Sequence, residues 1–215
     1  SKAHVGAVAD TVERAVVLLG FDAVRCMVLS MQVFDALSPG KSKASTRLDL
    51  VGLWKHSLAV GCAARLICET LRARASSVRP SMRENLRFDP ARLPRLEEAF
   101  LCGLLHDIGK LALNVAFPKS YDRAVATVAE THRSISEVER DLFGLDHTLA
   151  GRRLATHWRL PEAVVESIWL HHLTPATTPT RINFPLHVQI VELADRIARE
   201  LRVGHSGNLA IESAA

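Results

Sequence analysis

Apolar residues recur along most of this chain at the three- and four-residue spacing of helices, and no run alternates as a half-buried strand would. The pattern predicts helices over residues 10–38 (broken near Gly20), 48–74, 95–116, 120–132, 134–143, 147–158, 161–172 and 185–203. Ser134 and Glu137 form a capping-box pattern that opens one of them. With almost no room for a β-sheet, we expect an all-α protein.

The helix expected over residues 95–116 is apolar almost all round, which is typical of a buried helix. It nevertheless contains His106 and Asp107, a polar pair that is costly to bury without compensation. A bound metal ion would compensate, and so would hydrogen bonds to neighbouring helices. The pair alone leaves both interpretations open.

Further potential ligands occur in or at the ends of other predicted helices. They are His56, His147, the adjacent His171 and His172, and Asp195. Each has a simple alternative explanation, such as an ion pair between Asp195 and Arg199 one helical turn later. Taken together, however, the residues could build a pocket for two divalent metal ions. Imidazoles and carboxylates suit Fe, Mn, Ni, Zn and Mg to different degrees, so residue type does not select the metal.

The order His … His-Asp-x-Gly-Lys … His … His-His … Asp resembles the HD superfamily of metal-dependent phosphohydrolases, and within it the HD-GYP phosphodiesterases that cleave cyclic di-GMP. The resemblance implies one ion held by His56, His106, Asp107 and Asp195, and a second held by Asp107, His147, His171 and His172. It also implies that Asp107 bridges the ions and that Lys110 faces the substrate phosphate, so these two residues are the expected catalytic residues. Two ions against two carboxylates would leave the positive balance that a phosphate ester requires.

The segment after the paired histidines departs from HD-GYP, because it reads His171-His172-Leu173-Thr174-Pro175-Ala176 and contains no Gly-Tyr-Pro. Other segments resemble the HDOD family, the HD-related output domains of bacterial signalling proteins. These segments are Val17–Arg25, Leu53–Ser57, Phe100–Gly109 and His157–Pro161. The resemblance runs from about residue 8 to residue 202 and implies an HD-domain-like helical bundle.

We therefore expect one HDOD-type domain over residues 1–203, truncated at its N-terminus, and a C-terminal linker over residues 204–215. Two functions fit it. The first is a phosphohydrolase with two metal ions that acts on a nucleotide or cyclic nucleotide. The second is a catalytically silent output module that binds a partner protein or a fused signalling domain.

The net charge of +4 is concentrated in one segment. Residues 71–95 carry seven arginines against Glu84 and Asp89, so the rest of the chain is close to neutral. We interpret residues 72–95 as an Arg/Pro-rich insertion, either solvated or gathering phosphates at the pocket mouth. The remaining charge gives no reason to expect specific nucleic-acid binding.

The cysteines and the apolar runs indicate a cytoplasmic protein. Cys26, Cys62, Cys68 and Cys102 form no C-x-x-C pair and lie in apolar helical stretches, as buried thiols in a reducing compartment do. The most apolar run, residues 21–37, is interrupted by charged and polar side chains, so no membrane span is expected. No secretion signal is visible in the sequence.

Overall fold

The computed structural model describes residues 47–78, 88–172 and 181–207, and the helix expected over residues 10–38 lies outside them. Its α-helices are α3 (Leu50–Ser77), α4 (Leu96–Leu105), α5 (Ile108–Ala116), α6 (Pro118–Thr131), α7 (Ile135–Phe143), α8 (His147–His157), α9 (Glu162–Leu170) and α10 (Pro185–Glu200), with a 3-10 turn, η2, at Pro90–Arg92. The described ranges contain no strand. The prediction of an all-α protein is confirmed.

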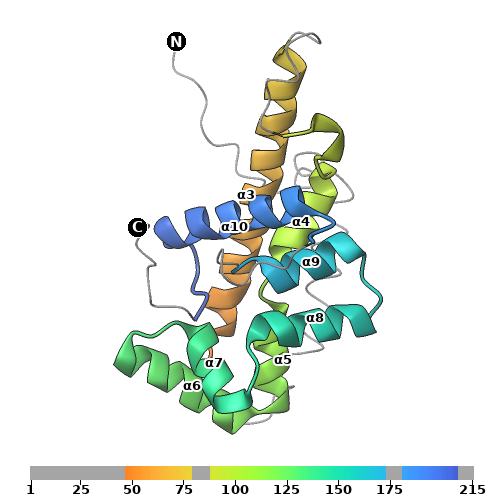
Figure 1. Cartoon of the computed structure of the whole chain (residues 1–215). Helices are drawn as coiled ribbons and strands as arrows, with labels where there is room; N and C mark the ends of the chain where they lie inside the picture. Colours follow the sequence, from red (N-terminus) through yellow and green to blue (C-terminus); the bar gives the residue numbers. More distant parts are fainter. Residues whose placement is uncertain (1–46, 79–87, 173–180, 208–215) are drawn as a thin grey trace, which may run out of the picture.

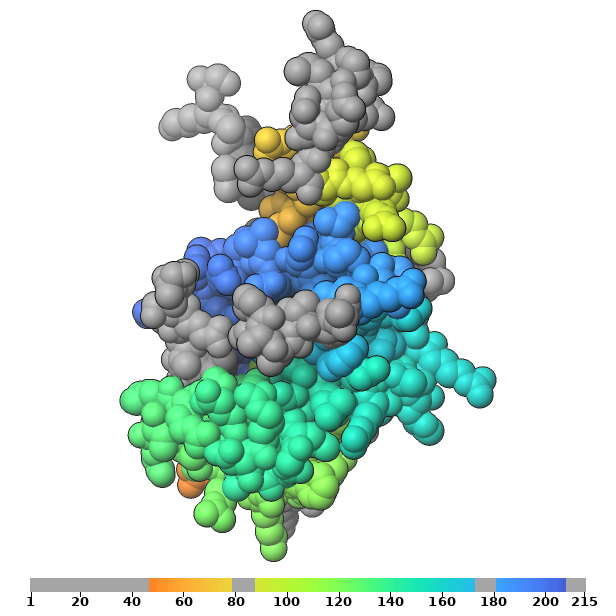
Figure 2. Space-filling model, viewed as in Figure 1, coloured from red at the N-terminus to blue at the C-terminus, as the bar shows by residue number. Residues whose placement is uncertain are grey.

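The long helix α3 is the axis of the bundle, and α4 and α10 pack against it (Figure 1). A second group of contacts joins α5 to α8 and α8 to α9. Helices α6 and α7 pack on each other and cover the end of the molecule below α10, as the green surface of Figure 2 shows. Helices distant in sequence therefore meet near the middle of the bundle.

Local sequence accounts for where the helices begin. The side chains of Asp49, Ser134 and Asp146 cap α3, α7 and α8 by accepting hydrogen bonds from backbone N–H groups in the first turn. Helices α6 and α10 instead start with proline, whose fixed φ and missing N–H suit a first helical position. Of the capping box predicted at Ser134, the structure shows the N-cap bond, with the Glu137 N–H donating to Ser134 Oγ at 3.2 Å.

The prediction of a single helix over residues 95–116 is wrong in one respect, because the helix is interrupted at His106 and Asp107. Asp107 has φ −97° and ψ 11°, outside the helical range, and it becomes the N-cap of α5. Its carboxylate makes no capping bond there. It therefore lies at the positive end of the α5 dipole and remains available to other groups.

Glycines allow the helices that carry the site to approach closely. A Cβ added at Gly103 of α4 would lie 2.8 Å from the carbonyl oxygen of Val60 in α3. A Cβ added at Gly109 of α5 would lie 1.8 Å from the carbonyl oxygen of His147 in α8. Both contacts are with backbone, so a larger residue would push the helices apart.

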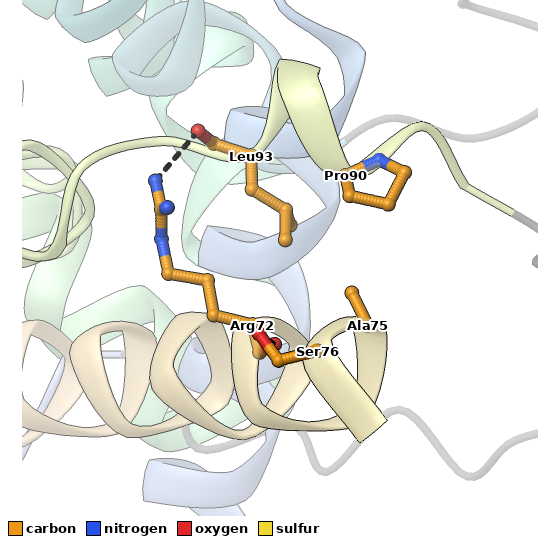
Figure 3. A pocket seen from close by; sticks show the side chains of 5 residues that line it. All are labelled: Arg72, Ala75, Ser76, Pro90 and Leu93. Carbon is orange, nitrogen blue, oxygen red and sulfur yellow. Dashed lines mark hydrogen bonds between the residues drawn. The ribbon is translucent and has the colours of Figure 1, made fainter. Parts of the chain in front are cut away.

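Where the structure describes it, the Arg/Pro-rich segment is more regular than the insertion that the sequence predicted. Residues 72–77 belong to α3, and residues 79–87 lie outside the described residues. Arg72 donates to the carbonyl oxygens of Leu93 and Pro94 and so ties the segment back to α3. Figure 3 shows the bond from Arg72 to Leu93 at the edge of a small cavity, which is also lined by Pro90. The volume of this cavity is about 140 Å³. At this position an arginine acts as a structural donor.

Two helices are long and apolar enough to cross a membrane by length and composition alone. They are Leu50–Ser77 and, taken across the break, Leu96–Ala116. In the second, 78% of the apolar window is buried inside the domain, as in the core helix of a globular protein. The run that the sequence marks as most apolar, residues 21–37, lies outside the described residues.

Two of the three described cysteines are buried as predicted, and Cys62 is exposed. Burial raises the pKa of the Cys102 thiol to about 12, so it stays protonated at pH 8. We expect iodoacetamide to alkylate Cys62 in the native protein and to leave Cys102 unmodified, as peptide mass spectrometry would measure. Equal labelling of the two thiols would contradict this packing of α4.

Candidate metal centre

Seven histidine and aspartate side chains from five segments converge inside the bundle. His56 lies on α3, His106 and Asp107 lie at the α4–α5 junction, and His147 is the first residue of α8. His171 and His172 follow α9 directly, and Asp195 lies in the middle of α10. Six of them are at most 2% exposed, and His172 is partly buried. All the metal-ligand candidates taken from the sequence are therefore brought together.

The seven residues form two groups whose donor atoms all lie within 4.8 Å of one another, one of His56, His106 and Asp195, the other of Asp107, His147, His171 and His172. In the first group, His56 Nε2 lies 3.0 Å and His106 Nε2 lies 3.9 Å from Asp195 Oδ1. Donor atoms about 2.1 Å from a shared ion lie at most about 4.2 Å apart, so these spacings fit a common metal.

The two oxygens of Asp107 face different groups. Oδ2 lies 3.3 Å from His106 Nε2 and 3.9 Å from His56 Nε2. Oδ1 lies 3.4 Å from His147 Nε2 and 3.6 Å from His171 Nε2. A carboxylate placed in this way can bridge two ions.

The imidazole nitrogens that point into the site have no hydrogen-bond partner. This holds for Nε2 of His56, His106, His147, His171 and His172, and for Asp107 Oδ1. Buried polar atoms are nearly always paired, so a cluster of unpaired ones requires an explanation. A metal ion is the group that satisfies several imidazole lone pairs and a carboxylate at once. The donor set therefore fits divalent metal ions.

Hydrogen bonds on the far side of the rings hold three of the histidines in this orientation. The Nδ1 atoms of His106 and His171 donate to the carbonyl oxygens of Gly103 and Ile168, at 2.6 Å and 2.9 Å. His147 Nδ1 lies 2.6 Å from a carboxylate oxygen of Glu139. A donating Nδ1 leaves the lone pair on Nε2, the tautomer that metal binding requires.

The protonation states also suit metal ligands. Burial raises the pKa of Asp107, but the neighbouring His106 and Lys110 outweigh it and hold that pKa well below its usual value. Burial also raises the pKa of Asp195, but the nearby His56 imidazole and the charges of His106 and Arg199 outweigh it and hold that pKa below its usual value. Burial lowers the pKa of His171 to about 4, so this imidazole is neutral at physiological pH.

Lys110 does not point into open space. Its ammonium group is 1% exposed and donates to Asp107 Oδ2 at 2.6 Å and to the carbonyl oxygen of Ser206 at 2.7 Å. The resemblance had implied that this lysine faces a substrate phosphate. In the structure its ammonium group instead donates to the carboxylate of Asp107.

The bond to Ser206 also changes the expected end of the domain. Residues 204–207 pack on the bundle, with the His205 N–H donating to Gly52 O at 2.9 Å. Gly204 has φ +72°, and an added Cβ there would meet the backbone of α3. The linker predicted from residue 204 is therefore not free over these four residues, and residues 208–215 lie outside the described range.

Sequence reasoning missed Glu139 and Tyr121. Glu139 is fully buried and bonds to both His147 and Tyr121. The available signal was its spacing, since Ile135, Val138 and Glu139 share the buried face of α7. The ion pair that the sequence offered as the alternative role of Asp195, with Arg199, is present at 2.9 Å beside the ligand cluster. His187, two turns before Asp195, lies near Glu98 and belongs to neither ligand group.

The fold and the site define a class of protein: a helical bundle whose central helices bring an HD pair and five further ligand-type residues together. The HDOD domain family matches residues 3–174, and the chain belongs to this family.

The chain is also similar to two solved structures and to one sequence relative. An HDOD domain protein with unknown function from Geobacter sulfurreducens is 27% identical, with a TM-score of 0.67, over 95% of this chain and 59% of that chain. The MmoQ response regulator from Methylococcus capsulatus is 27% identical, with a TM-score of 0.52, over 91% of this chain and 66% of that chain. An uncharacterized protein of Treponema pallidum is 29% identical over 80 residues, which are 37% of this chain and 16% of that protein. The chain thus spans less than two thirds of each of these relatives.

Proposed function

We propose that this chain is a cytoplasmic domain of a bacterial signalling protein, that it binds two divalent metal ions, and that it hydrolyses a phosphate ester of a nucleotide or cyclic nucleotide. The observation that carries the proposal is the convergence of unpaired imidazole Nε2 atoms on both oxygens of Asp107. Buried hydrogen-bonding residues without a metal would not leave so many nitrogens unpaired.

In this proposal the two groups hold one ion each and share Asp107. His56, His106 and Asp195 complete the first set, and His147, His171 and His172 complete the second. A pair of divalent ions supplies activated water and stabilises the charge that develops on a phosphate ester. Asp107 and Asp195 neutralise only part of the metal charge, which leaves the site attractive to an anionic phosphate.

The role of Lys110 follows from its contacts. It keeps Asp107 ionised and directs one carboxylate oxygen, Oδ2, toward the first group. To reach a substrate phosphate as well, its ammonium group would have to release the carbonyl of Ser206.

This buried lysine supports the second candidate function, a catalytically silent output module that binds a fused or partner signalling domain. The missing Gly-Tyr-Pro segment points the same way. Such a module would use the metal ions to stabilise the bundle or to sense a phosphorylated nucleotide without turnover.

Metal content tests the proposal. Protein purified without chelator should contain about two equivalents of divalent metal by elemental analysis, and Asp107→Ala should lose both because it removes the shared ligand. Asp141→Asn, an exposed carboxylate change on α7, is the control and should keep both. Loaded protein is then assayed with bis(p-nitrophenyl) phosphate and manganese or iron.

Hydrolysis that disappears in Asp107→Ala would support the enzyme, whereas two bound ions without hydrolysis would favour the silent module. No metal in the native protein, even after loading with excess ion, would overturn the dinuclear site.

A further inference from the structure

Three buried side chains, Tyr121, Glu139 and His147, form a hydrogen-bonded relay next to the candidate metal centre. Glu139, on the inner face of α7, is 0% exposed and accepts three hydrogen bonds. The donors are the His147 backbone N–H at 2.7 Å, His147 Nδ1 at 2.6 Å and the Tyr121 hydroxyl at 2.9 Å. Both carboxylate oxygens are thus held, and the relay joins α6, α7 and α8.

The carboxylate determines which nitrogen of His147 carries the proton. An ionised carboxylate can only accept hydrogen bonds, so His147 Nδ1 must donate. The lone pair then lies on Nε2, which faces Asp107 Oδ1 at 3.4 Å and has no hydrogen-bond partner. The second bond, from the His147 backbone, fixes the first residue of α8 and with it the origin of the side chain.

The negative charge of Glu139 also favours a cation at the candidate metal centre. A fully buried carboxylate is costly unless positive charge balances it. Its ion-pair partner within the described part of the chain is the imidazole of His147. A cation bound at His147 Nε2 would supply the missing positive charge through the ring. Tyr121 remains a donor, because burial and the charge of Glu139 raise its pKa well above the usual value.

The rings of His106 and His171 are held differently. The Nδ1 atoms of His106 and His171 donate to main-chain carbonyl oxygens, which carry no net charge. The carboxylate on His147 therefore strengthens an imidazole of the second group as a ligand.

We infer that Glu139 is a positioning residue that sets the metal affinity of the subsite formed by Asp107, His147, His171 and His172, with Tyr121 holding its carboxylate in place. The inference rests on the proposed function, because it presumes a metal at this subsite.

The test compares metal binding by the native protein, Glu139→Gln, Glu139→Ala and Tyr121→Phe, with Asp141→Asn as the exposed control on the same helix. Manganese affinity is measured by titration and metal content by elemental analysis. We expect Glu139→Ala to bind the second ion roughly 10- to 100-fold more weakly and to retain the first. Glu139→Gln preserves shape and an accepting oxygen and should show a smaller loss, while Asp141→Asn should match the native protein.

A second measurement needs no metal. The imidazole ¹⁵N shifts of His147 in metal-free protein should show Nδ1–H alone in the native chain and a mixture of tautomers in Glu139→Ala.

Unchanged affinity for both ions in folded Glu139→Gln and Glu139→Ala would overturn the inference but would not contradict the dinuclear site. Absence of metal from the native protein would overturn the proposed function. If Glu139→Ala does not fold, the near-isosteric Glu139→Gln decides: loss confined to the second ion supports the inference, and equal loss of both ions overturns it.

Discussion

Replacement of Gly109 with alanine is expected to destabilise the protein by about 3 kcal/mol or more and to remove metal binding at His147. The added Cβ would lie 1.8 Å from the His147 carbonyl oxygen and 2.7 Å from the Gly151 backbone nitrogen. Both atoms belong to the backbone of α8, so no side chain can rotate to make room. Helices α5 and α8 must separate, and the two residues that they bring together, Asp107 and His147, separate with them.

Urea unfolding and manganese titration would measure the two effects. Gly144→Ala is the matched control, since Gly144 has φ +72° but no atom within 4 Å of an added Cβ. It should cost only the roughly 1–2 kcal/mol of a left-handed backbone and leave metal binding intact. A Gly109→Ala protein with native stability and native metal affinity would show that α5 and α8 do not pack this closely.

The helix pattern was predictable because each helix buries an apolar stripe, and spacing in the sequence reports that stripe directly. The break at His106 and Asp107 was not, because the apolar positions continue through it without a change of period. No proline or helix-breaking cluster marks the site. The break follows from tertiary packing, in which α5 must turn to lie against α8.

The candidate ligands were predictable from residue type and order, while the groups that support them were not. Glu139 bonds to a histidine eight residues away through space, and Lys110 bonds to Ser206 across 96 residues. Neither partnership leaves a spacing in the sequence, because it depends on how helices and the C-terminal segment are placed in three dimensions. The same reason explains why residues 204–207, small and polar, resembled a linker.

The second large effect is expected for Lys110→Met and depends on metal. In metal-free protein the change should destabilise the fold by about 3–5 kcal/mol, because it leaves the buried carboxylate of Asp107 without the ammonium group that now lies 2.6 Å away. Methionine fills similar space, so the cost arises from charge and not from a cavity. The Ser206 carbonyl loses its donor at the same time.

With both subsites loaded, divalent ions face the same carboxylate and provide the positive charge that Lys110 otherwise supplies. The cost of Lys110→Met should therefore fall by at least half on loading, as urea unfolding with chelator and with saturating manganese would show. Lys55→Met, an exposed change on α3, should stay within about 0.5 kcal/mol of the native protein in both conditions. An equal cost of Lys110→Met with and without metal would mean that no ion contacts Asp107. The lysine would then be the permanent counter-ion of a structural carboxylate, as a silent output module without metal would require.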